Sequence, residues 1–191
     1  MLEINFDKLL TKPIFRILGK CVLETGEKSY VIGGYVRDYL IGKSNTKDID
    51  IVVVGSGIKL AKNIKKNLPD SSKIQIFKSY GTAMINWKNL TLEFVGTRKE
   101  SYSKESRNPK VFSSSLQDDQ KRRDFTINTL AISLNKEDFG KLIDPFGGII
   151  DLENKVIKTP LDPLKTFSDD PLRMLRAIRF SCQLNFKIES K

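Results

Sequence analysis

The chain has 191 residues, of which 39% are hydrophobic and 29% are charged, a composition typical of one globular domain or slightly more. It contains no histidine, which excludes Ser-His and Cys-His nucleophile systems and His-ligated zinc from this sequence. The 33 Lys and Arg residues outnumber the 23 Asp and Glu residues, and this net charge of +10 favours an anionic partner such as nucleic acid, although a solvated lysine surface would give the same balance.

The cysteines and the apolar runs indicate a cytoplasmic protein. Cys21 and Cys182 lie far apart without metal-ligand spacing, as expected of free or buried thiols in a reducing compartment. Residues 1–10 carry three charges and lack the apolar core of a signal peptide. The longest apolar run, 51–54, is far too short to span a membrane, so we expect no membrane contact.

The first half of the chain shows a series of helical and strand patterns. Apolar residues recur at helical spacing in some segments and alternate with polar residues in others. The segment that follows Gly55 is amphipathic, with lysines on its outer face. The predicted elements are a helix over 13–24, a strand over 29–32, a helix over 36–41, a strand over 48–54, a helix over 57–68, and strands over 73–77, 82–87 and 91–95.

The second half begins with a polar stretch. Residues 98–118 are charged and serine-rich without any period, so we predict a long loop, which in a compact domain is usually functional or mobile. Residues 119–134 are predicted to be mainly helical, 144–148 to form a turn, and 156–157 to form a short strand.

A helix is predicted from Asp169 onward. Asp170 can cap it, Pro171 suits its first turn, and Leu172, Leu175 and Ile178 form an apolar stripe. The sequence thus predicts an α/β domain over 1–140 and the start of a helical domain over 141–191. Because the chain ends soon after that helix, we expect it to be a fragment of a longer protein.

Two aspartates on the predicted strand over 48–54 are the first candidate site. Asp48 and Asp50 project from one face of the strand, because residues two apart in a strand share a face. Exposed acids can also protect an edge strand from pairing. The apolar run that follows is typical of a buried strand, where unpaired acids are costly, so we favour a Mg²⁺ site.

Two further features could complete such a site. Glu93 lies on a polar strand face and is a candidate third carboxylate. Gly33 and Gly34 lie between a predicted strand and a predicted helix, where backbone N–H groups can approach an anion, although a plain tight turn has the same sequence. Arg37 follows one helical turn later and can neutralise phosphate oxygens.

Four motifs occur in the order in which one known family has them. They are GGYVRDYLIG with DIDIVV within 33–53, RRDFTIN at 122–128, DPFGG at 144–148 and DDPLR at 169–173. Together they make the chain resemble the class II tRNA nucleotidyltransferase/poly(A) polymerase family over about residues 29–181. The resemblance implies a polymerase-β-like nucleotidyltransferase head, of the α/β (α+β) class with a mixed sheet, followed by a helical neck.

The resemblance also implies a role for each candidate residue. Asp48 and Asp50 are implied as Mg²⁺ ligands and, with Glu93, as the catalytic acids. Without the family, the arginines at 122–123 could equally form a basic surface. The residues implied to bind the nucleotide are Gly33, Gly34 and Arg37 for the triphosphate, Arg123, Asp124 and Asn128 for the phosphates and ribose, and Asp170, Arg173, Arg176 and Arg179 along the last helix.

Asp170 and Arg173 allow two interpretations. An acid at a helix start and an i, i+3 acid–base pair are common structural features. The family implies instead that this pair acts as a protein template for the incoming base. A carboxylate accepts a hydrogen bond from an exocyclic amine and a guanidinium donates to ring acceptors, so the pair suits cytosine and adenine, whereas uracil lacks the amine.

The implied reaction is attack by an RNA 3′-hydroxyl on the α-phosphate of CTP or ATP, with CCA addition to the tRNA 3′ end as the leading hypothesis. A poly(A) polymerase and an enzyme adding only CC or only A are the alternatives within the family. A small-molecule adenylyltransferase and an inactive RNA-binding module are alternatives outside it. The family places a flexible loop, involved in nucleotide switching, at 98–118, where Arg98, Glu100, Tyr102 and Arg107 lie.

Overall fold

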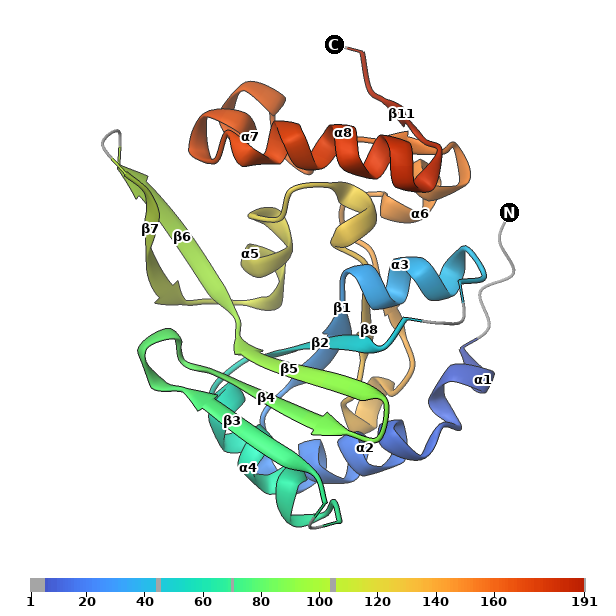
Figure 1. Ribbon diagram of the computed structural model, residues 1–191, viewed down its shortest axis with the longest axis vertical. Coiled ribbons are helices and arrows are strands. Elements are labelled where there is room, and N and C mark those ends of the chain that lie inside the picture. The colour runs from blue at the N-terminus through green and yellow to red at the C-terminus, as the bar shows by residue number, and fades with distance from the viewer. Residues whose placement is uncertain (1–5, 44–45, 70, 104–105, 191) are drawn as a thin grey trace.

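The computed structural model describes residues 6–43, 46–69, 71–103 and 106–190, and is built around one seven-stranded sheet (Figure 1). The strand order is β3-β4-β5-β2-β1-β8-β9, and only β2 and β5 run parallel to each other. The strands are β1 (Ser29–Ile32), β2 (Asp48–Val53), β3 (Lys73–Phe77), β4 (Thr82–Trp87), β5 (Leu90–Gly96), β8 (Ala131–Ser133) and β9 (Leu142–Ile143). The predicted α/β class with a mixed sheet is confirmed.

Eight α-helices and three short 3-10 turns occur in the described residues. The elements predicted between residues 13 and 96 are all observed, with ends within two residues of the prediction. The helices are α1 (Asp7–Leu10), α2 (Pro13–Thr25), α3 (Gly34–Leu40), α4 (Gly57–Lys66), α5 (Leu116–Lys121), α6 (Gly148–Glu153), α7 (Pro163–Asp169) and α8 (Leu172–Leu184), and the 3-10 turns are η1 (Lys78–Tyr80), η2 (Thr126–Asn128) and η3 (Lys136–Asp138).

Helices α2 and α4 pack together and cover one face of the sheet (Figure 1). The apolar side chains of α4 pack against β4 and β5, and its lysines point outward. From β2 and β5, Ile49, Ile51, Leu92 and Phe94 join the same core and are completely buried. Since burying one such side chain stabilises a fold by about 1.5–3 kcal/mol, this core fixes both strands.

The opposite face of β2 and β5 carries the acids. Asp48 is exposed and Asp50 half-buried, in the alternation predicted for this strand. A smaller apolar cluster of Tyr30, Ile32, Val52 and Ala131 covers part of this face. Beyond that cluster the sheet is open, which leaves the carboxylates accessible.

The DPFGG motif forms the predicted turn and joins α6 to the rest of the domain. The Asp144 carboxylate accepts hydrogen bonds from the backbone N–H groups of Gly148 (2.7 Å) and Ile149 (2.9 Å). A Cβ atom at Gly148 would lie 2.4 Å from the carbonyl oxygen of Thr126. Only glycine permits this close contact between α6 and η2.

The prediction of a long loop over 98–118 was wrong. Strands β6 (Arg98–Ser103) and β7 (Ser106–Ser113) form a separate antiparallel ribbon that projects from the body, and α5 follows it (Figure 1). Apolar alternation marks a strand that buries one face, whereas a ribbon needs only backbone pairing. The predicted loop residues Glu100, Tyr102 and Arg107 therefore belong to strands.

The prediction of a helix over 119–134 was wrong beyond its first turn. The α-helix ends at Lys121, η2 follows, and Ala131–Ser133 form β8, which pairs with β1. The Asp124 carboxylate accepts hydrogen bonds from the backbone N–H of Phe125 and from the Asn128 side chain. Such local side-chain bonds compete with helix formation, and the sheet takes the apolar residues that follow.

The apolar stripe predicted for α8 does not face the core. Leu172, Leu175 and Ile178 are exposed, at 42%, 64% and 56%, whereas Ala177 and Phe180 are buried. Helical spacing would allow either of these two faces to be buried, and contacts with the rest of the domain select the face of Ala177 and Phe180. The predicted strand over 156–157 is confirmed as β10 (Val156–Ile157), which pairs in parallel with β11 (Lys187–Ile188).

Both cysteines within the described part of the chain are free thiols, Cys21 buried and Cys182 exposed. Burial raises the pKa of Cys21 to about 11. No helix among the described residues is long and apolar enough to cross a lipid bilayer.

Candidate active site

The carboxylates of β2 and β5 meet because the two strands run in parallel register. Asp50 lies directly opposite Glu93, and Asp48 lies opposite Thr91. Burial raises the pKa of Asp50 above its ordinary value; the nearby Arg123 opposes that rise and Asp48 adds to it. Burial also raises the pKa of Glu93, and the charges of Asp50 and Asp48 raise it further. The three acids therefore interact electrostatically.

The donor set of these acids suits a hard divalent cation. Within the described ranges, no group of three His, Cys, Asp or Glu side chains is arranged to hold a metal ion by itself. Mg²⁺ seldom needs such a cage, because it binds one or two carboxylates together with waters and substrate phosphates. Burial is the larger cause of the raised pKa values of Asp50 and Glu93, and a cation between Asp48 and Asp50 would relieve the carboxylate repulsion that adds to it.

Gly33 allows the side chains of the site to approach one another. Its φ of +82° is strained for other residues, and a Cβ atom there would lie 3.0 Å from Arg123 Nη1 and 3.7 Å from Asp50 Oδ2. Its N–H donates to the Leu130 carbonyl (3.0 Å), so this group is already used rather than open to a phosphate. The glycine therefore brings Arg123 close to Asp50.

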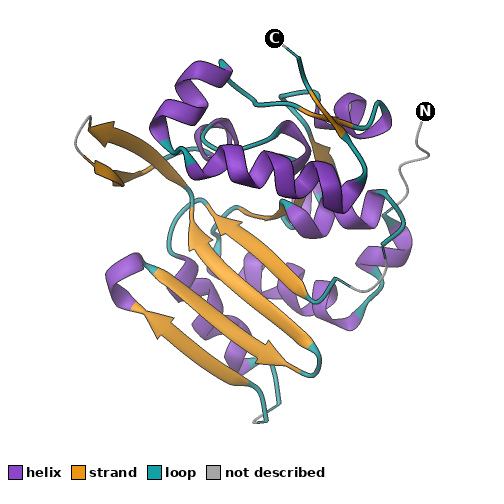
Figure 2. Ribbon diagram, turned by 45° about the horizontal axis from the view of Figure 1, so that its top comes forward, coloured by secondary structure: helices purple, strands orange, loops and turns teal. Residues whose placement is uncertain are grey.

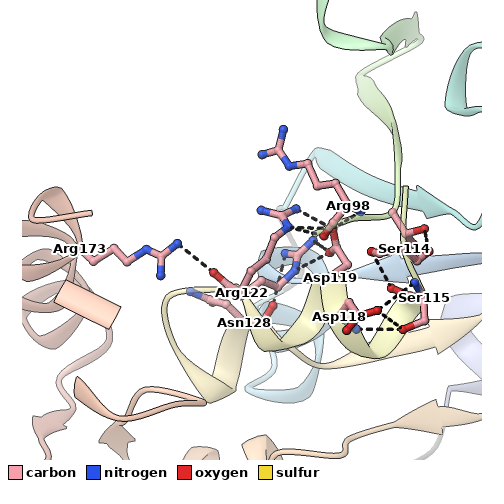
Figure 3. A network of polar contacts seen from close by, with 10 residues as sticks. Arg98, Ser114, Ser115, Asp118, Asp119, Arg122, Asn128 and Arg173 are labelled. Carbon is pink, nitrogen blue, oxygen red and sulfur yellow. Dashed lines mark hydrogen bonds and ion pairs between the residues drawn. The ribbon is translucent and has the colours of Figure 1, made fainter. Parts of the chain in front are cut away.

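A buried acid, Asp119, holds the two arginines of the RRDFTIN motif (Figure 3). Arg122 donates through Nε (3.1 Å) and Nη2 (2.6 Å) to Asp119 Oδ1. Arg123 donates through Nε and Nη2 (both 3.2 Å) to Asp119 Oδ2. Both guanidinium groups are thus fixed at one wall of a cleft, and they do not form a loose basic surface.

Asp124 connects this motif to α8. Its Oδ2 accepts hydrogen bonds from Arg176 Nε (2.7 Å) and Nη2 (2.6 Å), while Oδ1 accepts from Asn128 Nδ2 (3.0 Å) and the Phe125 N–H (2.8 Å). Both oxygens are occupied by protein donors. In this structure Asp124 therefore positions α8 and Asn128, and a direct contact with the nucleotide would require one of these bonds to change.

Arg37 lies behind the site rather than in it. Its side chain is 6% exposed and donates to Asp38 Oδ1 (2.9 and 2.8 Å) and to Asn128 Oδ1 (2.7 Å). Its guanidinium carbon also lies 5.0 Å from the centre of the Phe180 ring. This geometry therefore does not favour the predicted contact between Arg37 and a triphosphate. Arg37 instead orients the Asn128 side chain.

Leu172, Arg173 and Arg176 of helix α8 line the second wall of the cleft. Figure 2 shows the helices and strands of the molecule from a second direction. Asp170 Oδ1 accepts from the Leu172 N–H (3.2 Å), the capping interaction predicted for it. Arg173 Nη2 donates to the carbonyl oxygen of Arg122 (2.9 Å; Figure 3). Arg179 does not line the cleft, and its guanidinium carbon lies 4.9 Å from the Phe180 ring centre.

One open cleft of about 510 Å³ brings most of the predicted residues together. Six of the predicted residues do not line this cleft. Two of them are arginines that contact the Phe180 ring, Arg37 and Arg179, and the other four are Gly33, Gly34, Asp48 and Asn128. The predicted residues that line the cleft are Asp50, Glu93, Arg123, Asp124, Asp170, Arg173 and Arg176, joined by Ile51, Val52, Val95, Arg98, Arg122 and Leu172.

Sequence reasoning missed two residues that support this site. Asp119 lies three and four residues before Arg122 and Arg123, a helical spacing that could have indicated the pairing. Phe180 packs edge-on against Phe125, with ring centres 5.9 Å apart, and contacts three arginines. A single phenylalanine on an amphipathic helix carries no sequence signal for such a role.

Several curated proteins named as tRNA nucleotidyltransferases or CCA-adding enzymes are similar to this chain in sequence. It is 47% identical over 161 residues to an A-adding tRNA nucleotidyltransferase of Aquifex aeolicus, covering 84% of this chain and 19% of that protein. It is 36% identical over 192 residues to a CCA-adding enzyme of Bacillus velezensis, covering 100% of this chain and 44% of that protein.

Solved structures give the same picture. A CCA-adding enzyme, apo form II, superimposes with a TM-score of 0.85 at 40% identity, over 98% of this chain and 45% of that one. A tRNA nucleotidyltransferase complexed with a primer tRNA and an incoming ATP analog gives 0.76 at 43% identity, over 90% and 46%.

The chain thus spans less than half the length of each of these proteins. The family model of the poly A polymerase head domain matches residues 29–158, more than half of the chain. The chain therefore belongs to the tRNA nucleotidyltransferase/poly(A) polymerase family and contains its head domain.

Proposed function

We propose that the chain is the catalytic part of an RNA nucleotidyltransferase that adds CCA to tRNA 3′ ends from CTP and ATP. The observation that carries the proposal is the shared cleft: carboxylates from β2 and β5 on one wall, Asp170 and Arg173 on the other, and fixed arginines between them. The names of the similar proteins support nucleotidyl transfer to tRNA, one by CCA addition and another by addition of A. We also propose a cytoplasmic location, and a division into a head over 1–140 and the start of a neck over 141–191.

The acids are assigned to metal binding and catalysis. Asp48 and Asp50 would hold Mg²⁺, with Glu93 beside them as the third acid. When bound, the metal supplies positive charge that orients the phosphate oxygens and stabilises the charge that develops on them. The side chains lie on a rigid pair of strands, so their positions do not depend on the substrate.

The arginines that line the cleft beside Asp50 are assigned to the triphosphate. Arg123 lies next to Asp50 across Gly33, and Arg122 lines the same cleft. Guanidinium groups bind phosphate oxygens through paired hydrogen bonds. The 3′-hydroxyl would lose its proton to a neighbouring carboxylate or to water as its oxygen forms a bond to the α-phosphorus. The bond from that phosphorus to the bridging oxygen would break, and pyrophosphate would leave along this arginine wall.

Asp170 and Arg173 are assigned to selection of the base. Only Oδ1 of Asp170 forms a hydrogen bond within the described residues, and this side chain lines the cleft, so Oδ2 is available to an exocyclic amine. Cytosine and adenine carry that amine and uracil does not. The pair would therefore disfavour UTP, because a bound uracil would leave the Asp170 acceptor without an amine donor.

The experiment supplies tRNAs that end before CCA, after C or after CC, each with a single nucleoside triphosphate and Mg²⁺. Ordered addition of C, C and A that stops by itself is expected. Addition of A alone to tRNA ending in CC would replace this proposal with the second candidate, an A-adding enzyme, which the 47% identity to the Aquifex aeolicus protein favours. Long A tails on any RNA would contradict both and indicate a poly(A) polymerase.

A further inference from the structure

Asp119 is the most completely enclosed charged residue near the cleft. Its relative exposure is 0%, yet its carboxylate accepts hydrogen bonds from both guanidinium groups of the RRDFTIN motif (Figure 3). It also accepts one from the backbone N–H of Arg98 (3.4 Å). Because both oxygens are occupied by protein donors, Asp119 has no acceptor site left for a substrate.

The local structure fixes where this carboxylate points. Ser115 and Asp118 form a reciprocal capping box that sets the start of α5. Arg122 is the last residue of that helix turn, and its N–H donates to the Asp118 carbonyl (3.3 Å). Arg122 and Arg123 follow Asp119 by three and four positions, so their side chains can reach back to its carboxylate.

The two arginines face the place where phosphates are expected. Arg122 and Arg123 both line the cleft that contains Asp50. The single charge of Asp119 neutralises only one of the two guanidinium charges that it holds. A held guanidinium group loses little further freedom on binding phosphate, which favours binding over a freely rotating one.

We propose that Asp119 is a positioning residue for the triphosphate of the incoming nucleotide, acting through Arg122 and Arg123. The proposal rests on the proposed function, because it assumes that a nucleotide occupies the cleft. It also assigns Asp119 a link to the β6–β7 ribbon, whose first residue, Arg98, donates its N–H to the same carboxylate and accepts from Arg122 Nε (3.2 Å) at its carbonyl oxygen.

The chemistry of this role predicts which ligands lose affinity. Displacement of the two arginines should weaken the binding of every ligand that has a β- and a γ-phosphate, whichever base the ligand carries. It should leave nucleoside monophosphates nearly unaffected. A purely structural role would weaken all ligands together, through partial unfolding.

The test measures binding of CTP, ATP and CMP to the chain with Mg²⁺ and without RNA, so that no turnover occurs. Asp119→Asn keeps the size and removes the charge, and should weaken CTP and ATP binding by about 10- to 100-fold with CMP changed less than about twofold. Glu24→Gln is the control: it removes a charge of the same sign from the exposed side of α2, on the other face of the sheet, and should leave CTP binding unchanged.

Asp119→Glu covers the case in which the Asn variant does not fold. It keeps the charge but moves the carboxylate, and should weaken CTP and ATP binding by about the same factor for both. CTP binding equal to wild type in a folded Asn or Glu variant would overturn the positioning role and leave the proposed function intact. A wild-type chain that binds neither CTP nor ATP would instead remove the proposed function, and this inference with it.

Discussion

The two walls of the cleft are held in place by different means. The sheet wall carries its acids on β2 and β5, which pair in register over six residues and are anchored by a buried core on their other face. The helix wall depends on a few side-chain contacts: the Arg176–Asp124 ion pair, the bond from Arg173 to the Arg122 carbonyl, and the contacts of Phe180.

This difference suits two different tasks. Bond formation at phosphorus needs carboxylates that do not move, because small displacements of reacting groups cost much of the rate. The proposed recognition of two different bases needs a wall that can adjust, and side-chain contacts provide that more readily than a β-sheet. We therefore expect changes on the sheet wall to affect the rate, and changes on the helix wall to affect stability and base choice.

The largest effect is expected at the sheet wall. Asp48→Ala and Asp50→Ala each remove an oxygen donor assigned to Mg²⁺, and should lower kcat about 1,000-fold or more, since the metal contributes several kcal/mol. Single-turnover incorporation measures this, with thermal unfolding as a check that the variants fold. Incorporation within tenfold of wild type would show that these acids do not hold the metal.

The next effect separates the two faces of α8. Phe180→Ala removes a buried ring that contacts Phe125 and three arginines, and should lower the free energy of unfolding by about 3–5 kcal/mol. Leu175→Ala, on the exposed face of the same helix, should change it by less than about 0.5 kcal/mol. Chemical denaturation of both variants tests the comparison, and equal losses would mean that the helix packs in another orientation.

The buried face of α8 could not be predicted from the sequence. Leu172, Leu175 and Ile178 make as good an apolar stripe as Ala177, Phe180 and Leu184, so helical spacing alone predicts a helix but does not choose its buried face. The choice is made by residues far away in sequence. Asp124 binds Arg176 from 52 positions earlier, and no local pattern contains that contact.

The acid strand shows the opposite case. The alternation of Asp48 and Asp50 with buried isoleucines follows from the two-residue period of a strand, which is a local property, and the structure confirms it. The 119–134 segment lies between these cases. Its apolar residues fit a helix, but Asp124 ties the chain into a turn and β1 provides a partner for Ala131–Ser133, which only the folded sheet can supply.

A smaller loss of stability is expected at the junction of the two walls. Gly33→Ala places a side chain at a φ of +82° and 3.0 Å from Arg123 Nη1, and should cost about 1–3 kcal/mol in unfolding free energy. Gly34→Ala is the matched control, since its Cβ would lie 3.6 Å from the nearest atom, within a helix. An equal loss of stability in both variants would contradict the close approach described for Gly33.

The smallest effect on overall rate is expected at the template pair. Asp170→Asn replaces an acceptor with a group that can also donate, so uracil gains a partner and the preference for CTP over UTP should fall by about tenfold or more. The ratio of kcat/KM for the two nucleotides measures this. An unchanged ratio combined with a reduced rate would mean that Asp170 only caps α8.

The most direct test of nucleotidyl transfer measures which phosphate of CTP enters the RNA. A tRNA that ends before CCA is incubated with the chain, Mg²⁺ and CTP labelled at either the α- or the γ-phosphate, with α-labelled UTP as a comparison. The account predicts that label enters the RNA from α-labelled CTP only, while γ-label appears in pyrophosphate. Label in the RNA from γ-labelled CTP, or equal incorporation from UTP, would contradict it.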